Sequence, residues 1–338
     1  MKKAIIVGER KAELAEVPTP EPKEDWALVK VHAAPMCTEY KAFQKGNRSE
    51  FLGHEAAGEV VAVAQPCQVE VGDRVVVMPL YACGKCRLCV AGDYIHCQHS
   101  YNFTQFVGSP EGSGTYAQYL LKPSWLLPKI PDGVPYERAG LALCALGPSF
   151  NACARMRVDA FDTVLITGAG PVGMGGVVNA CFRGARVIVA ESIPYRVAKV
   201  KELGAAAVVD PTKDDALKQI LDLTAGLGVD KAFDCSGASA AHRLCIDAIR
   251  RRGHMAFVGE GSGDTVIHAS DDMIRKGITL QGVWHYNLSD FPKIMQVIQH
   301  SPVVGQLITH TFPMSQIQQA FEVSASRQCG KIILKPWE

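Results

Sequence analysis

Four cysteines lie close together in the chain at a spacing that is typical of a metal site. Cys83, Cys86, Cys89 and Cys97 form the pattern CxxCxxC followed by a fourth cysteine eight residues later. Four thiolates in so short a segment can surround one tetrahedral Zn²⁺ at Zn–S distances of about 2.3 Å, which leaves no position for a substrate. We therefore predict a structural zinc site in a lobe spanning residues 80–100. The alternatives are disulfides, which a reducing cytosol disfavours, and an iron–sulfur cluster.

A second set of metal-binding residue types occurs earlier in the chain. Cys37 is followed by His54 and Glu55, which directly precede a short apolar run at residues 58–63. Cysteine, histidine and carboxylate are ligands of catalytic zinc, which keeps one position open for a substrate oxygen. A lone cysteine or a histidine before a strand is, however, more often a structural residue. The sequence alone leaves both interpretations open.

A glycine pattern typical of nucleotide-binding turns lies near the middle of the chain. Gly168, Gly170 and Gly173 form GxGxxG between an apolar run at residues 163–167 and a helical segment. In this context the first glycine makes the turn, and the second lets a pyrophosphate approach N–H groups at a helix N-terminus. The third allows the helix to pack closely on the strand. The alternative is a glycine-rich turn that serves helix packing alone.

An acidic residue follows the next apolar run, where a dinucleotide site requires one. Glu191 comes after residues 186–190, about 20 residues beyond the glycines. Its carboxylate can accept hydrogen bonds from both ribose hydroxyls and would repel a 2′-phosphate, so we predict NAD rather than NADP. Arg196 is the argument for NADP, because a guanidinium could reach a phosphate. A solvated glutamate at a strand end is the alternative.

Two sequence patterns indicate the secondary structure that positions these residues. Short apolar runs near the N-terminus are separated by prolines, which is typical of turns between antiparallel strands. From Asp162 onward, apolar runs alternate with helical segments, which predicts a parallel sheet covered by helices. These later runs lie at residues 163–167, 186–190, 207–209, 230–234 and 255–258. The alternation breaks up after about Ile278, and helices are predicted at residues 291–300 and 314–322.

Length and charge limit the possible functions. The chain has 338 residues, more than the roughly 250–300 at which single cores stop growing, so two domains are expected. The 35 Lys and Arg residues and 34 Asp and Glu residues give a net charge of +1, which does not favour a nucleic-acid partner. Residues 1–9 lack the features of a secretory signal, and the apolar stretch 163–182 is too rich in glycine for a membrane span. A cytoplasmic protein with a small, neutral or weakly polar ligand and no membrane partner is expected.

These motifs together resemble the zinc-dependent medium-chain alcohol and polyol dehydrogenases, such as the sorbitol dehydrogenases. The resemblance is carried by Gly53-His54-Glu55 with Gly58 and Val60, by Val71-Gly72-Asp73-Arg74-Val75, by the four-cysteine lobe and by GxGxxG. Their order and spacing agree from about Lys2 to Pro336. The resemblance implies an α/β protein with a GroES-like, partly open β-barrel catalytic domain at residues 1–146 and 278–338. A doubly wound Rossmann domain that binds NAD would occupy residues 147–277.

The resemblance also implies site residues. Cys37 and His54 would ligate a catalytic zinc, Glu55 would be a ligand that exchanges with water or substrate, and Cys144 would be the remaining ligand. A buried helical cysteine is the alternative for Cys144. Two Zn²⁺ ions per chain are therefore expected. The expected cofactor-binding residues are Gly168, Gly170, Pro171, Val172, Gly173, Glu191, Arg196, Ser236, Val258 and Gly259.

The chain departs from the family pattern at two places. After its first cysteine the family usually has CxTDxH or CxSDxH, whose hydroxyl and histidine relay the substrate proton, whereas here Cys37 is followed by Thr38, Glu39, Tyr40 and Lys41. A one-residue deletion, which we favour, would make Thr38 the relay hydroxyl and Lys41 the terminal base. An ungapped match would put Glu39 beside the zinc. The second departure is His285, where sorbitol dehydrogenases carry an arginine near the substrate.

The expected function is the reversible, NAD-dependent oxidation of a secondary alcohol of a small polyol, such as a sugar alcohol or cyclitol, to the ketone. The alternatives are oxidation of a hydroxyalkyl group on a larger biosynthetic intermediate, a non-catalytic relative that binds zinc and nucleotide, and a zinc-free reductase. A homo-oligomer is expected on resemblance alone, as a tetramer or a dimer. The cysteines expected to be free thiols are Cys67, Cys153, Cys181, Cys235, Cys245 and Cys329.

Overall fold

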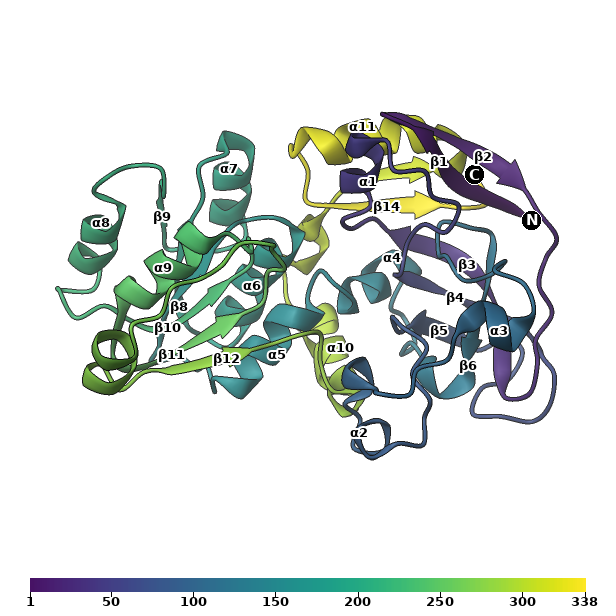
Figure 1. Ribbon diagram of the computed structural model, residues 1–338, viewed down its shortest axis with the longest axis horizontal. Coiled ribbons are helices and arrows are strands. Elements are labelled where there is room, and N and C mark those ends of the chain that lie inside the picture. The colour runs from purple at the N-terminus through teal and green to yellow at the C-terminus, as the bar shows by residue number, and fades with distance from the viewer. The chain divides into compact units, whose positions relative to one another are not determined.

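The computed structural model describes all 338 residues, and they divide into two compact units (Figure 1). The first unit comprises Met1–Leu143, Asn287–Gln299 and Ile308–Glu338. The second comprises Cys144–Tyr286 and His300–Leu307. Both ends of the chain therefore belong to the same unit.

The first unit is built mainly from antiparallel strands. Strands β1 (Lys2–Gly8) and β2 (Lys11–Glu16) form a two-stranded sheet. A larger sheet has the order β13-β14-β3-β4-β5, and β6 also pairs with β3. Its strands are β3 (Trp26–Pro35), β4 (Ala56–Val63), β5 (Arg74–Val77), β6 (Tyr119–Pro123), β13 (Ile308–Pro313) and β14 (Lys331–Lys335). Because β3 pairs with three strands, it forms the buried centre of this unit.

Short helices cover this sheet and connect its strands. Phe43 of α1 stacks on Phe321 of α11 with ring centroids 4.9 Å apart, which joins the two ends of the chain in one apolar core. The helices are α1 (Tyr40–Lys45), α2 (Arg87–Val90), α3 (Phe103–Val107), α4 (Tyr136–Ala139), α10 (Phe291–His300) and α11 (Ile317–Ser326).

The second unit contains the predicted parallel sheet. Its order is β12-β11-β10-β7-β8-β9, and every neighbouring pair is parallel. The strands are β7 (Thr163–Thr167), β8 (Arg186–Ala190), β9 (Ala207–Val209), β10 (Val229–Asp234), β11 (Ile249–Phe257) and β12 (Thr279–Gly282). The strand order reverses between β7 and β10, so this is the doubly wound arrangement expected for a dinucleotide-binding domain. The predicted α/β class is confirmed.

Helices flank the parallel sheet. Helix α6 packs against α5 and α7, while α8 packs against α9. Their bounds are α5 (Gly147–Arg155), α6 (Pro171–Phe182), α7 (Pro194–Glu202), α8 (Ala216–Asp222) and α9 (Ser239–Ala248), and a π-helix, η4 (Ala269–Arg275), precedes β12.

The boundaries of the second unit differ from the expected 147–277. The unit continues to Tyr286 because β12 pairs with β11, starting at Thr279 opposite His254. A four-residue strand containing Gln281 and Gly282 is too short and polar to be recognised as a buried strand in the sequence. The unit also includes residues His300–Leu307 and begins at Cys144.

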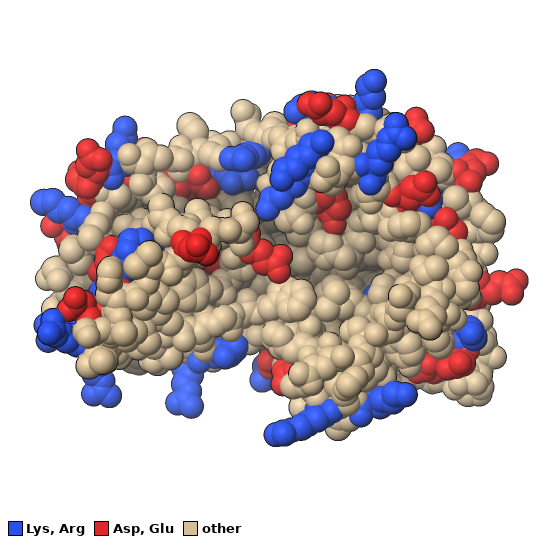
Figure 2. All heavy atoms as spheres, viewed as in Figure 1, with Lys and Arg blue, Asp and Glu red and all other residues tan.

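The surface carries charges of both signs. Figure 2 shows basic and acidic side chains interspersed over the visible face, with no extended area of one sign, in keeping with the net charge of +1. None of the helices has the length and apolar character needed to cross a membrane.

Candidate functional site

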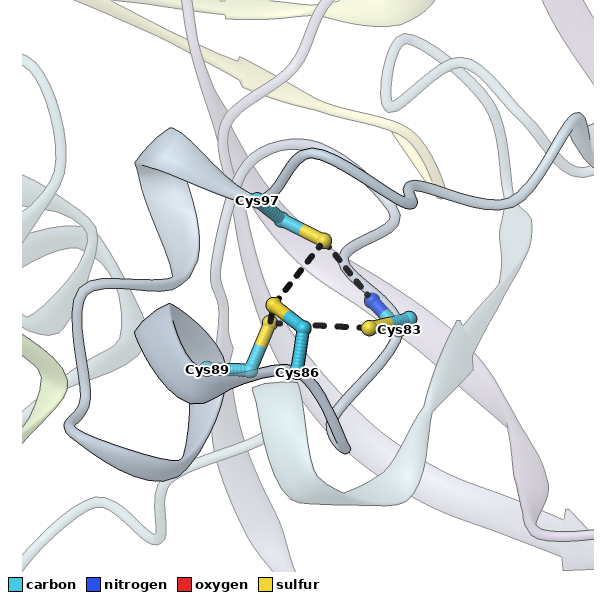
Figure 3. Close-up of side chains that lie close together, drawn as sticks. All are labelled: Cys83, Cys86, Cys89 and Cys97. Carbon is cyan, nitrogen blue, oxygen red and sulfur yellow. Dashed lines mark hydrogen bonds between the residues drawn. The ribbon is translucent and has the colours of Figure 1, made fainter.

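The four cysteines of the predicted lobe converge on one point (Figure 3). Cys86 is the N-cap of α2 and Cys89 lies within this helix. Cys83 precedes the helix, and Cys97 follows the 3-10 helix η1 (Tyr94–His96). The Sγ atoms of Cys86 and Cys89 are 3.4 Å apart, and those of Cys83 and Cys89 are 3.9 Å apart. All four sulfur atoms lie within 4.8 Å of one another.

This spacing fits zinc. Four thiolates around a tetrahedral Zn²⁺ at about 2.3 Å place neighbouring sulfurs about 3.8 Å apart. The backbone N–H groups of Cys83 and His99 also donate to Cys97 Sγ, each at 3.4 Å. Burial raises the pKa of the Cys97 thiol, but these hydrogen bonds outweigh it and lower the pKa to about 6. The thiolate that a metal needs is thereby favoured.

A second donor cluster contains Cys37, His54, Glu55 and Cys144, whose ligand atoms also lie within 4.8 Å of one another. Cys37 comes just after β3, and His54 and Glu55 come just before β4, so the pairing of these two strands brings them together. Cys144 follows Leu143, the last residue of the first unit's long segment. It lies between the 3-10 helix η3 (Gly140–Ala142) and α5, which rules out the helical alternative for this cysteine.

Glu39 lies against this cluster. Its Oε1 atom is 2.9 Å from Nδ1 of His54, and its Oε2 atom accepts a hydrogen bond from the Cys37 backbone N–H at 3.1 Å. Thr38 and Lys41 are exposed. Glu39 therefore lies against the cluster, which is where the ungapped alignment puts it. The relay roles of Thr38 and Lys41 stay predictions.

The electrostatics of this cluster favour a cation. Burial lowers the pKa of His54, but hydrogen bonds to Cys37 and Glu39 and the charges of Glu55 and Glu39 outweigh it and raise the pKa to about 11. Burial raises the pKa of Glu39, but hydrogen bonds from His54 and Tyr116 outweigh it and lower the pKa to about 2. Donors that draw a proton onto the imidazole in this way would also favour a metal ion in its place.

Two partners of this cluster were missed in the sequence. Lys331 donates to Oε1 of Glu55 at 2.6 Å, and both side chains are almost completely buried. Burial raises the pKa of Glu55 to about 7 despite the opposing charge of Lys331. Tyr116 donates to Oε2 of Glu39 at 2.8 Å. No local motif links either residue to the cluster, since they lie 276 and 77 positions from their partners.

The glycine turn has the geometry of a phosphate-binding loop. Gly168 adopts a φ of +82°, which makes the turn after β7. A Cβ atom on Gly173 would lie 1.9 Å from the carbonyl oxygen of Gly168, so helix and turn can approach only with glycine there. A Cβ on Gly170 would meet nothing within 4 Å, which leaves open space at the start of α6. Pro171 and Val172 form the first turn of this helix.

Glu191 is fixed beside the glycine turn. Its Oε2 accepts from the Ala169 N–H at 2.9 Å, and its Oε1 accepts from the N–H groups of Ser192 and Ile193 at 2.8 and 2.9 Å. Arg196 lies 3.8 Å from Oε2. The carboxylate is thus held at the carboxyl edge of the sheet, where a ribose would lie.

The remaining expected cofactor residues gather around Asp234 at the end of β10. The backbone N–H groups of Val258 and Gly259 both donate to the Asp234 carbonyl, and the Ser236 hydroxyl donates to its carboxylate at 2.6 Å. Gly168 is close by, since a Cβ there would lie 2.8 Å from Cβ of Ser236. Asp234 itself was missed, although an acidic residue at a strand end is a recognisable signal.

His285, the second departure from the family pattern, is buried in the second unit. Its φ of +53° is unusual for a residue with a side chain, and its ring stacks on Tyr286 with centroids 4.7 Å apart. Its carbonyl accepts from Nδ2 of Asn151 at 2.8 Å. These contacts describe a packed side chain.

Comparisons with known proteins bear on both units. A family model described as the alcohol dehydrogenase GroES-like domain matches residues 23–132, and one described as zinc-binding dehydrogenase matches residues 171–300. Sorbitol dehydrogenase of Bacillus subtilis (strain 168) is 30% identical over 99% of this chain and 97% of its own length. L-threonine 3-dehydrogenase of Pyrococcus horikoshii is 31% identical over 95% of this chain and 94% of its own. A solved Escherichia coli oxidoreductase/dehydrogenase of unknown specificity superposes with a TM-score of 0.86 and 27% identity, covering 99% of this chain and 98% of its own.

Proposed function

The chain belongs to the zinc-dependent alcohol and polyol dehydrogenase family, and from that premise we propose that it oxidises a secondary alcohol of a small polyol with NAD. The substrate would be a sugar alcohol, a cyclitol or a similar hydroxylated molecule, and the product the corresponding ketone. The relative named sorbitol dehydrogenase supports this substrate class. The nearly neutral charge balance also suits an uncharged substrate.

The observation that carries this proposal is the four-donor cluster, whose ligand atoms lie within 4.8 Å of one another. Two thiolates, an imidazole and a carboxylate are a donor set of catalytic zinc. We propose Cys37, His54 and Cys144 as ligands, with Glu55 as a fourth that gives way to water or substrate. Together with the four-cysteine site, the chain would hold two zinc ions.

Bound zinc would supply a Lewis acid for the substrate hydroxyl, and NAD would accept the hydride. The chain's residues prepare the site for them. Glu39 keeps the Nδ1 side of His54 occupied, which leaves Nε2 to act as a ligand. Lys331 holds the Glu55 carboxylate through a buried ion pair, so that this fourth donor can withdraw without becoming an unpaired buried charge.

We further propose that Glu191 selects NAD. Three backbone N–H groups fix its carboxylate, and Oε2 accepts only one of them, so that oxygen can still accept a ribose hydroxyl. A 2′-phosphate would meet its negative charge, although Arg196 lies nearby. The glycine turn, Pro171 and Val172 would bind the pyrophosphate, and Ser236, Val258 and Gly259 would line the neighbouring edge of the sheet.

A second substrate class is a hydroxyalkyl group next to charged substituents. The L-threonine 3-dehydrogenase relative supports it, because threonine also carries a secondary alcohol. Such a substrate would need partners for its ammonium and carboxylate groups. It is therefore included in the test as a competitor.

The decisive experiment measures NADH formation by the purified protein with sugar alcohols, cyclitols, simple secondary alcohols and L-threonine, with and without a strong zinc chelator. Two zinc ions per chain and chelator-sensitive NADH formation with a polyol are expected. Cys37→Ser and His54→Ala should abolish activity and remove one zinc ion, whereas Cys67→Ser should change neither. Full activity of the first two variants with one zinc fewer would refute the mechanism. A single zinc ion and no activity would support a non-catalytic relative.

We also propose that the protein is a cytoplasmic homo-oligomer, a tetramer or alternatively a dimer. Strand β12 lies at one end of its sheet, so a second copy could extend the sheet there. Twelve cysteines without a disulfide suit a reducing compartment. Light scattering coupled to size-exclusion chromatography tests the assembly, and a monomeric mass would contradict it.

A further inference from the structure

Tyr116 connects the core of the first unit to the surroundings of the metal cluster. It lies just before β6, and its side chain is only 1% exposed. Its ring packs beside Phe321 in the apolar core, with centroids 6.3 Å apart. Its hydroxyl donates to Oε2 of Glu39 at 2.8 Å and accepts from the Cys37 backbone N–H at 3.2 Å. This one buried hydroxyl therefore contacts the proposed ligand residue Cys37 and also the Glu39 carboxylate, which contacts the proposed ligand His54.

Both oxygens of the Glu39 carboxylate contact these groups. Oε1 faces Nδ1 of His54 at 2.9 Å, and Oε2 accepts from Tyr116 and from the Cys37 N–H. Glu39 stands at the N-cap of α1, but its side chain does not cap that helix. The carboxylate thus serves His54 instead of the helix.

The segment that carries His54 is shaped around the Tyr116 ring. A Cβ atom on Gly53 would lie 2.3 Å from Cδ1 of this ring, and Gly53 has a φ of +81°. The backbone N–H of Tyr116 donates to the Leu52 carbonyl at 3.0 Å. The ring is therefore fixed relative to the residues directly before His54, and this fixes the position of its hydroxyl oxygen.

We propose that Tyr116 is a positioning residue of the metal centre. Its hydroxyl fixes the Glu39 carboxylate, which in turn fixes the His54 ring with Nε2 directed toward the metal. A glutamate has one more rotatable bond than an aspartate, so it needs an additional donor to hold one orientation. Outer partners of this kind orient a ligand histidine and set metal affinity. This inference rests on the proposed zinc at Cys37, His54, Glu55 and Cys144.

Tyr116→Phe removes the hydroxyl and keeps the ring that packs against Gly53. We expect the affinity for the second zinc ion to fall about tenfold, the lower end of the effect of losing an outer partner. Competition with a chromogenic chelator measures this affinity. Replacing zinc with Co²⁺ gives a second readout, because a reoriented His54 ligand shifts the visible d–d absorption.

Tyr119→Phe is the matched control. It makes the same chemical change three residues away, where the half-buried ring packs edge-on against Trp337 at 5.2 Å. It should leave the zinc affinity and the Co²⁺ spectrum unchanged. Glu39→Gln removes the charge of the carboxylate that the Tyr116 hydroxyl contacts. The double variant with Tyr116→Phe should bind zinc only slightly more weakly than Glu39→Gln alone, because both changes act through one carboxylate.

Three outcomes separate the possibilities. If Tyr116→Phe binds zinc and Co²⁺ as the unaltered protein does, the positioning role is refuted. If the effects of Tyr116→Phe and Glu39→Gln multiply independently, Tyr116 does not act through Glu39 and the proposal is also overturned. If the unaltered protein binds only the four-cysteine zinc, the proposed catalytic centre fails and this inference fails with it.

Discussion

Glu55 and Lys331 form a buried ion pair across 276 positions of the chain. The Lys331 side chain is 1% exposed to solvent and the Glu55 side chain is fully buried. Such a pair adds little net stability, because the cost of desolvating both charges offsets their attraction. Removing one partner is strongly destabilising, because it leaves an uncompensated buried charge. The ammonium of Lys331 therefore governs whether the Glu55 carboxylate can stay charged beside the cluster. The exchangeable ligand role that we propose for Glu55 is compatible with this pairing, because the carboxylate keeps a charged partner when it is not on the metal.

Gly53 and Gly72 provide a matched test of the contact between Gly53 and Tyr116. Gly72 has a φ of +96° and open space around it, so Gly72→Ala should cost about 1–2 kcal/mol of backbone strain. Gly53→Ala adds a clash with the Tyr116 ring and Thr115, which should cost about 1–3 kcal/mol more. Thermal melting should show a lower Tm for Gly53→Ala. Equal melting temperatures for the two variants would contradict the close packing.

Glu191→Gln tests cofactor selection with little change in size. The amide removes the negative charge and leaves one oxygen that can accept hydrogen bonds. A hydrogen bond to a charged group contributes about 1.5–3 kcal/mol, so kcat/KM with NAD should fall roughly 10- to 100-fold. The value with NADP should fall less or rise, because the repulsion of the 2′-phosphate is gone. Steady-state kinetics with both cofactors measure the ratio, and an unchanged ratio would exclude selection by Glu191.

Strand β6 carries a buried lysine that ties it to the start of the cysteine lobe. Lys122 Nζ donates to the Leu80 carbonyl at 2.8 Å and lies 3.9 Å from the centre of the Tyr81 ring. Burial lowers the pKa of Lys122 from 10.5 to about 7. Between these values the folded chain holds Lys122 neutral while the unfolded chain protonates it. The folded state then binds fewer protons, so this lysine makes stability increase with pH.

Lys122→Met should remove this pH dependence. Between pH 7 and pH 9, the Tm of the unaltered protein should rise relative to that of the variant, because deprotonating the buried lysine becomes easier. Lys41→Met, at an exposed lysine, should follow the unaltered protein at each pH. Parallel Tm curves for the unaltered protein and Lys122→Met would show that Lys122 stays charged when folded.

At the scale of elements, the sequence predicts buried parallel strands best. Strands β7 and β8 begin and end where the apolar runs do, because a strand covered on both faces is apolar throughout. Strand β11 begins at Ile249, six residues before the predicted start. The sequence prediction missed this part of the strand because it contains three consecutive arginines. Arginine runs and the short β12 give no apolar signal. Their pairing depends on the neighbouring strands, which the local sequence does not describe.

Across the whole molecule, the residues that could bind a metal were easier to recognise in the sequence than the residues that support them. Cys37, His54 and Glu55 stood out because their residue types and motif are recognisable. Tyr116 and Lys331 could not be recognised in this way, because a single tyrosine or lysine among apolar residues carries no motif that links it to a metal site. The antiparallel pairing of β14 with β3 is what brings the C-terminal strand to the site. Such long-range pairing is a property of the complete fold.

The four-cysteine lobe should depend on its metal for order. Its helices, α2 and η1, are only four and three residues long, and helices this short are not stable on their own. Structural zinc contributes its binding energy to folding. Cys86→Ser should therefore reduce the zinc content by one ion per chain and lower the Tm. Trypsin should also cleave faster after Lys85 and Arg87, which are exposed.

The effect should extend to a contact outside the lobe. Nδ2 of Asn287 donates to the Ala91 carbonyl at 2.7 Å and to Oδ1 of Asp93 at 2.9 Å, which fastens the lobe's turn to the C-terminal part of the first unit. Asn287→Ala removes these two hydrogen bonds, so it should increase tryptic cleavage of the lobe when the proposed zinc is bound, though less than Cys86→Ser does. Cys67→Ser, at a cysteine outside both donor clusters, should leave zinc content and cleavage unchanged. If Cys86→Ser kept two zinc ions and resisted trypsin, the lobe would be ordered without its metal.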